Sequence, residues 1–140
     1  MLIEKAANAG WYTVPDLGIP FSYGLQHPLL PLTQRDLISW TDKNLIILRG
    51  TADLNSDHNL RVTPEANAQG KNRYERAAYM IEKARAVNAH TRWELIDVPG
   101  ADHDQKKMAP AAQELFIKYS SKAGERGGMK PRARATVLQK

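Results

Sequence analysis

The chain has 140 residues, of which 42% are hydrophobic and 25% charged, and it contains no cysteine. This size and balance suit one soluble domain or a large piece of one, and large single-sheet α/β enzymes are usually longer. The lack of cysteine excludes a disulfide framework and a cysteine-ligated zinc site. No apolar run approaches the roughly 20 residues of a membrane-spanning helix, so no membrane partner is expected.

The net charge of +5 is concentrated at the C-terminus. Residues 122–140 contain six basic side chains and one acidic side chain, so the rest of the chain is neutral overall. A neutral body offers no basic face to a phosphate backbone, which argues against nucleic acid as a partner. We therefore predict a folded portion over residues 1–121 and a flexible basic tail over residues 122–140.

The N-terminal residues do not read as a signal peptide. Glu4 and Lys5 interrupt them, and no apolar stretch of roughly 7–15 residues follows. The localisation of the protein is therefore left open.

Three short apolar runs predict β-strands. The first covers residues 2–8 and is weak, because it contains an acidic and a basic residue. The second, 44–48, is continuously apolar, as is typical of a central parallel strand buried on both faces. The third, 92–98, alternates more loosely, which indicates a place nearer the edge of the sheet.

Helices are predicted between and after these strands. Residues 67–87 carry small and apolar side chains at three- and four-residue spacing, which makes strand, helix and strand a βαβ unit. A second helix is predicted over residues 109–119, with Pro110 in its first turn. Residues 11–40 contain several prolines and glycines without periodicity, which predicts a long irregular loop with a short helix at 33–38.

Two short motifs follow the second and third predicted strands. Gly50 ends the second strand, and Asp53 comes three residues later; His103 stands just beyond the Pro-Gly pair that ends the third. Reactive groups of open α/β sheets gather at the carboxyl ends of the strands, so these two side chains can approach each other. In such a pair the carboxylate orients the imidazole, whose other nitrogen deprotonates a serine.

Each signal is weak by itself, because a loop aspartate is more often a turn residue and a loop histidine a polar surface group. Their order on successive strands is more specific. The stretches that carry a family resemblance, including these two motifs, are residues 8–13, 20–25, 48–53, 63–66, 68–70 and 99–104. With these stretches the sequence resembles the last third of α/β-hydrolases and, more closely, bacterial hydrolases similar to poly(3-hydroxybutyrate) depolymerases. The resemblance covers about residues 3–116.

The resemblance implies an α/β fold, a partial α/β-hydrolase sheet of about three parallel strands with flanking helices. It also implies that Asp53 is the acid and His103 the base of a catalytic triad, and that the substrate of the full-length enzyme is a small or polymeric ester. No cofactor and no metal ion is expected.

The resemblance further implies that the nucleophile half of the domain is missing. In this fold the serine precedes the acid and the histidine and lies in G-x-S-x-G at a strand-to-helix elbow. No G-x-S-x-G occurs in the sequence. We therefore expect the serine upstream of Met1, and a C-terminal portion of an ester hydrolase that is inactive alone. If it folds alone, its open sheet edge predicts self-association.

Ser22 is the alternative nucleophile, because Ser22, Asp53 and His103 have the chain order of a triad. However, Pro20 stands where the elbow requires a small residue on a central strand. We therefore interpret Ser22 as a loop serine.

The sequence after Asp53 begins like a calcium-binding loop. His58 stands where that loop requires glycine, and Pro64 where it requires glutamate, so an EF-hand is excluded. The other histidines show no metal-ligand spacing around His103.

A function of another class also fits the same scaffold. The chain would then be a non-catalytic α/β binding module that uses the basic tail, residues 122–140, for an acidic partner. Salt-dependent binding to nucleic acid that is lost on deletion of the tail would favour this alternative.

Overall fold

The computed structural model describes residues 3–55 and 57–125 of the chain. Its strands form one parallel sheet in the order β1-β2-β3, which confirms the predicted α/β fold and the central place of the second strand. The strands are β1 (Ile3–Ala7), β2 (Asn44–Gly50) and β3 (Trp93–Val98). The helices are α1 (Gln34–Thr41), α2 (Pro64–Ala68), α3 (Arg73–Val87) and α4 (Gln105–Glu125).

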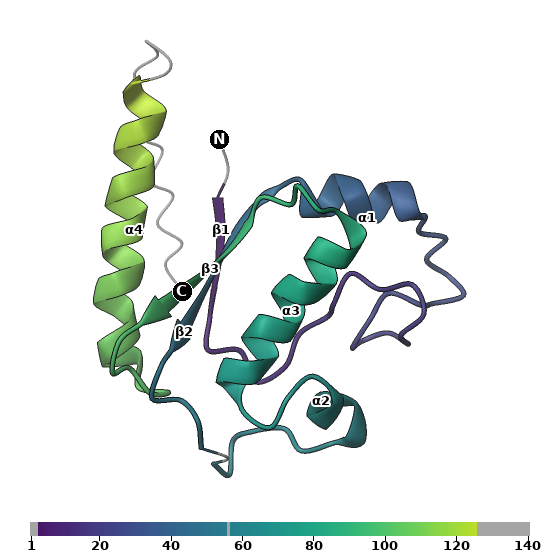
Figure 1. Cartoon of the computed structure of the whole chain (residues 1–140), viewed down its shortest axis with the longest axis horizontal. Helices are drawn as coiled ribbons and strands as arrows, with labels where there is room; N and C mark the ends of the chain where they lie inside the picture. Colours follow the sequence, from purple (N-terminus) through teal and green to yellow (C-terminus); the bar gives the residue numbers. More distant parts are fainter. Residues whose placement is uncertain (1–2, 56, 126–140) are drawn as a thin grey trace, which may run out of the picture.

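The helices cover both faces of the sheet, with α1 and α3 on one side and α4 on the other (Figure 1). Successive side chains of β2 point to opposite faces, as the pleat of a strand requires. Ile47 packs in one apolar cluster with Ala77 and Ile81 of α3. Leu48 packs in a second cluster with Met108 of α4. This double burial explains why β2 is apolar without interruption.

The helix predicted over residues 67–87 is two helices, α2 and α3. Gly70 separates them at φ 143°, a conformation that L side chains rarely adopt and that cannot continue a helix. Asn72 then begins α3, because its side chain accepts a hydrogen bond from the backbone N–H of Glu75 at 2.9 Å. The predicted helix began too early, because the regular spacing of small and apolar residues starts only at Tyr74, within α3.

Helix α4 is longer at both ends than the predicted helix over 109–119. Asp104 explains the earlier start, since its carboxylate accepts the N–H of Lys106 at 2.9 Å and satisfies a free amide of the first turn. Pro110 consequently lies inside the helix rather than in its first turn. At the other end, the first four residues of the predicted tail belong to α4, and residues 126–140 lie outside the described part of the chain.

Between β1 and α1 the chain is irregular, as predicted, and it is held by backbone hydrogen bonds. Val14 N–H donates to Tyr23 at 2.9 Å, and Leu25 N–H donates to Asp16 at 2.9 Å. Helix α1 begins after Thr33, which forms a capping box with the carboxylate of Asp36. The helix extends past residue 38, where it was predicted to end. Over residues 3–55 and 57–125, no helix has both the length and the apolar character needed to cross a bilayer.

Candidate active site

The loops that follow β2 and β3 are joined by hydrogen bonds at the carboxyl ends of the strands. Ala52 N–H donates to the carbonyl of Ala101 at 2.9 Å, and Thr51 N–H donates to that of Val98 at 3.1 Å. In return, the Gly100 N–H donates to the Thr51 hydroxyl at 2.9 Å. The β2 loop, which carries Asp53, and the β3 loop, which carries His103, therefore have a fixed relative position.

Gly50 permits this contact between the loops. A Cβ at this position would lie 2.2 Å from the carbonyl oxygen of Ala101 and 2.7 Å from its carbonyl carbon.

We expect Gly50→Ala to lower the free energy of unfolding by about 1–3 kcal/mol, because backbone must move to relieve the overlap. Urea unfolding measures the loss. Gly10→Ala is the matched control, since a Cβ there meets nothing within 4 Å; equal effects of the two substitutions would contradict the steric argument.

Asn8 joins β1 to the same group of loops, a role that the sequence analysis missed. It adopts a left-handed conformation, φ 43°, which asparagine tolerates better than most residues. Its side-chain oxygen accepts the Gly50 N–H at 3.0 Å, and its amide nitrogen donates to the carbonyl of Asp102 at 2.8 Å. One side chain thus contacts the ends of β1, β2 and the loop after β3. An asparagine directly after a strand is the only sequence signal of this role.

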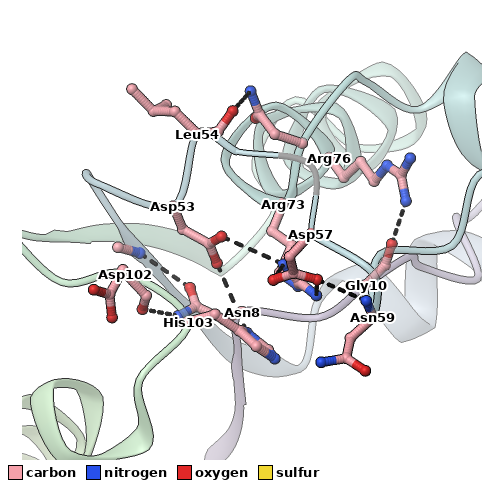
Figure 2. Close-up of polar contacts among 12 residues, drawn as sticks. Asn8, Gly10, Asp53, Leu54, Asp57, Asn59, Arg73, Arg76, Asp102 and His103 are labelled. Atoms are coloured by element: carbon pink, nitrogen blue, oxygen red, sulfur yellow. Dashed lines mark hydrogen bonds and ion pairs between the residues drawn. The ribbon is translucent and has the colours of Figure 1, made fainter.

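Asp53 and His103 are brought together by these loops (Figure 2). Oδ2 of Asp53 lies 3.8 Å from Nδ1 of His103. The carboxylate is buried, with a side chain only 4% exposed, whereas the imidazole is 46% exposed. Within residues 3–55 and 57–125, Oδ2 has no hydrogen-bond partner. The separation is longer than a hydrogen bond, as is common for catalytic pairs before substrate binds.

Arg73, the first residue of α3, faces the other oxygen of Asp53. Its Nη1 lies 3.5 Å from Asp53 Oδ1, and its guanidinium donates two hydrogen bonds to Asp57, at 3.0 and 3.1 Å. Burial raises the pKa of Asp53, and the nearby charges of Arg73 and His103 oppose that rise. The hydrogen bonds from Arg73 lower the pKa of Asp57 to about 2. The sequence analysis missed Arg73, which belongs to no motif, and it met Asp57 only within the loop that begins like a calcium-binding loop.

A cavity of about 370 Å³ lies beside His103. It is lined by Ala7 and Asn8 at the end of β1, by His103, and by Met108 of α4. Within the described residues β1 pairs only with β2, so its other edge, next to this cavity, is open. The exposed imidazole therefore has room on the side of β1 for a further group.

Ser22, the alternative nucleophile, lies in a turn between Pro20 and Gln26 and not between a strand and a helix. Its carbonyl accepts the hydroxyl of Thr13 at 2.6 Å. No hydrogen bond joins Ser22 to His103 in the part of the chain that the structure describes. Within the same residues, no three side chains of histidine, aspartate or glutamate gather so that they could hold a metal ion.

Two solved structures are similar to this chain in both fold and sequence. Poly(aspartic acid) hydrolase-1 from Sphingomonas sp. KT-1 matches with a TM-score of 0.75 and 39% identity, over 81% of this chain and 44% of that protein. LpqC, a poly(3-hydroxybutyrate) depolymerase from Bordetella parapertussis, matches with a TM-score of 0.75 and 31% identity, over 94% of this chain and 42% of that protein. No protein-family model and no curated protein matches the sequence.

The chain spans less than half the length of either hydrolase. The three parallel strands and their flanking helices match part of these α/β-hydrolase structures. The resemblance that the sequence motifs indicate is thereby confirmed: this chain matches part of the α/β-hydrolase structures of the Bordetella poly(3-hydroxybutyrate) depolymerase and the Sphingomonas poly(aspartic acid) hydrolase.

Proposed function

We propose that this chain supplies the acid and the base of a serine-hydrolase triad, Asp53 and His103, and that the nucleophile comes from a polypeptide segment outside this sequence. The observation that carries the proposal is the buried Oδ2 of Asp53, which faces Nδ1 of His103 and has no hydrogen-bond partner among the described residues. A buried acceptor without a partner is costly, so its persistence here fits a histidine that closes on it during reaction.

The two residues would act together to move the proton of a serine hydroxyl. Oδ2 of Asp53 accepts a hydrogen bond from Nδ1–H of His103, which fixes the tautomer of the imidazole. Nε2 is then free to take the proton of a serine hydroxyl as its oxygen attacks a carbonyl, and to return that proton to the leaving group. The ionised Asp53 stabilises the imidazolium between these two steps.

The open edge of β1 supports the position we propose for the nucleophile. A further strand that pairs in parallel with β1 ends at the same edge of the sheet as Ala7. A serine on the turn after that strand would enter the cavity lined by Ala7, Asn8 and His103. Without such a segment, we expect the open edge to make the chain self-associate.

The proposed substrate class is a polymeric or small ester or amide, whose carbonyl carbon accepts the serine. The two similar proteins are a poly(3-hydroxybutyrate) depolymerase and a poly(aspartic acid) hydrolase. One triad serves both carbonyl classes, because the same proton transfers are needed for an alcohol and for an amine leaving group.

A chimera tests the proposal. This chain replaces the matching portion of the Bordetella depolymerase, whose remaining portion is the source of the nucleophile. We expect the chimera to hydrolyse p-nitrophenyl butyrate, and we expect His103→Ala to abolish that activity because the substitution removes the base to which the proposal assigns the serine proton. His90→Ala is the matched control, since His90 is an exposed histidine in the turn after α3.

The chain alone is assayed in parallel and is expected to show no more esterase activity than its own His103→Ala variant. Activity of the chain alone that His103→Ala and Ser22→Ala both remove would overturn the proposal, since the nucleophile would then lie inside this sequence. A folded chimera whose hydrolysis survives His103→Ala would also overturn it.

A further inference from the structure

We propose that Arg73 is a positioning residue for Asp53: its guanidinium holds Oδ1 of the carboxylate so that Oδ2 faces His103. Figure 2 shows Asp53 between two nitrogen-bearing side chains, with His103 on one side and Arg73 on the other. The distances are 3.5 Å from Oδ1 to Nη1 of Arg73 and 3.8 Å from Oδ2 to Nδ1 of His103. Each oxygen of the carboxylate thus faces a nitrogen of a different side chain.

Arg73 is itself fixed in place. Its side chain is only 2% exposed, and both of its terminal nitrogens donate to the carboxylate of Asp57, a bidentate geometry that restricts the guanidinium to one plane. The start of α3 is in turn tied to the loop after β2, because the Asn72 side chain donates to the carbonyl of Leu54 at 3.2 Å. Helix α3 therefore delivers a rigid positive charge to the acid of the proposed triad.

The positive charge of Arg73 is needed to keep Asp53 ionised, because Asp53 is buried. A carboxylate that is 4% exposed loses its hydration, and without a compensating cation it would take up a proton. A protonated Asp53 cannot stabilise an imidazolium. The charged groups that face it are Arg73, His103 and Asp57, and Arg73 is the only one of these that is both cationic at every working pH and buried.

This inference rests on the proposed function for the role of Asp53, but its test needs no catalysis. The ionisation of Asp53 is followed by the carbon-13 shift of its carboxyl carbon during a pH titration of the 140-residue chain. In Arg73→Gln the pKa of Asp53 is expected to rise above its wild-type value, because the compensating cation is lost. In Asp57→Asn it is expected to fall, because a neighbouring negative charge is lost and Arg73 becomes free to approach Asp53.

Arg73→Lys gives the conservative rescue, with an expected pKa of Asp53 between those of the wild type and Arg73→Gln. Arg92→Gln is the control for net charge, since Arg92 lies at the opposite end of the sheet with its side chain 59% exposed. Opposite shifts in Arg73→Gln and Asp57→Asn support the inference. An unchanged titration of Asp53 in a folded Arg73→Gln protein overturns it and leaves the proposed function standing.

If Arg73→Gln does not fold, the titration of Asp53 in the Asp57→Asn variant tests the inference instead. The side chain of Asp57 is 35% exposed, and asparagine keeps its shape and one oxygen that can accept a hydrogen bond from Arg73. A lowered pKa of Asp53 then supports the inference, and an unchanged or raised pKa overturns it. An inactive chimera with normal Asp53 titrations would instead count against the proposed function alone.

Discussion

Asp53→Asn is expected to lower kcat of the chimeric hydrolase about 10⁴-fold, the loss associated with an asparagine in place of a triad acid. The asparagine amide matches the carboxylate in shape but carries no charge, so it does not stabilise the imidazolium. Its NH₂ group also favours the wrong tautomer of His103, whose Nδ1 must then accept a hydrogen bond instead of donating one. The measurement is the kcat for p-nitrophenyl butyrate, with KM determined separately.

The loss is expected in kcat with little change in KM, because Asp53 acts on the transition state and not on substrate binding. Asp42→Asn is the matched control: Asp42 lies at the other end of the sheet, with its side chain 59% exposed. A chimera whose kcat is equally insensitive to Asp53→Asn and Asp42→Asn would contradict the assignment of Asp53 as the acid. Far-UV circular dichroism of both variants separates a catalytic loss from unfolding.

The sheet was predictable because its signals are local. The continuous apolar run of β2 reflects burial on both faces, and Gly50 with Asp53 marks the loop that follows it. The proximity of Asp53 and His103 followed from topology alone, since parallel strands end at one edge of the sheet. The structure adds the distances and burial of these two side chains.

The residues around the pair were not predictable, because their roles depend on tertiary contacts. The spacing of small and apolar residues correctly placed Ala77 and Ile81 of α3 against the sheet, but it gave no buried place to the arginines at the start of this helix. Arg73 and Arg76 are instead among the most buried side chains of the described residues, 2% and 0% exposed. Only the three-dimensional arrangement brings carboxylates and carbonyls to them, and no pattern in the sequence records it.

Arg76 joins the loop after β1 to the segment between β2 and α3. Its guanidinium donates to the carbonyls of Gly70 and Arg61, at 2.9 and 2.8 Å, and also to the carbonyl of Gly10 (Figure 2). A further nitrogen donates to the side chain of Asn67 at 3.1 Å. The loops after β1 and β2 are therefore linked through one buried side chain of α3.

Arg76→Ala is expected to lower the free energy of unfolding by about 3–4 kcal/mol, because it removes charge-assisted hydrogen bonds and leaves buried carbonyl oxygens without donors. Burial lowers the pKa of Arg76, which shows the desolvation cost, but the guanidinium remains charged at any pH where the protein is studied. Urea unfolding measures the difference. Arg85→Ala is the matched control, since Arg85 is exposed in the last turn of the same helix and its loss should fall within about 0.5 kcal/mol. Equal stabilities of the two variants would show that the carbonyls find other donors, and that the loops bearing Asp53 and the end of β1 are held by their own contacts.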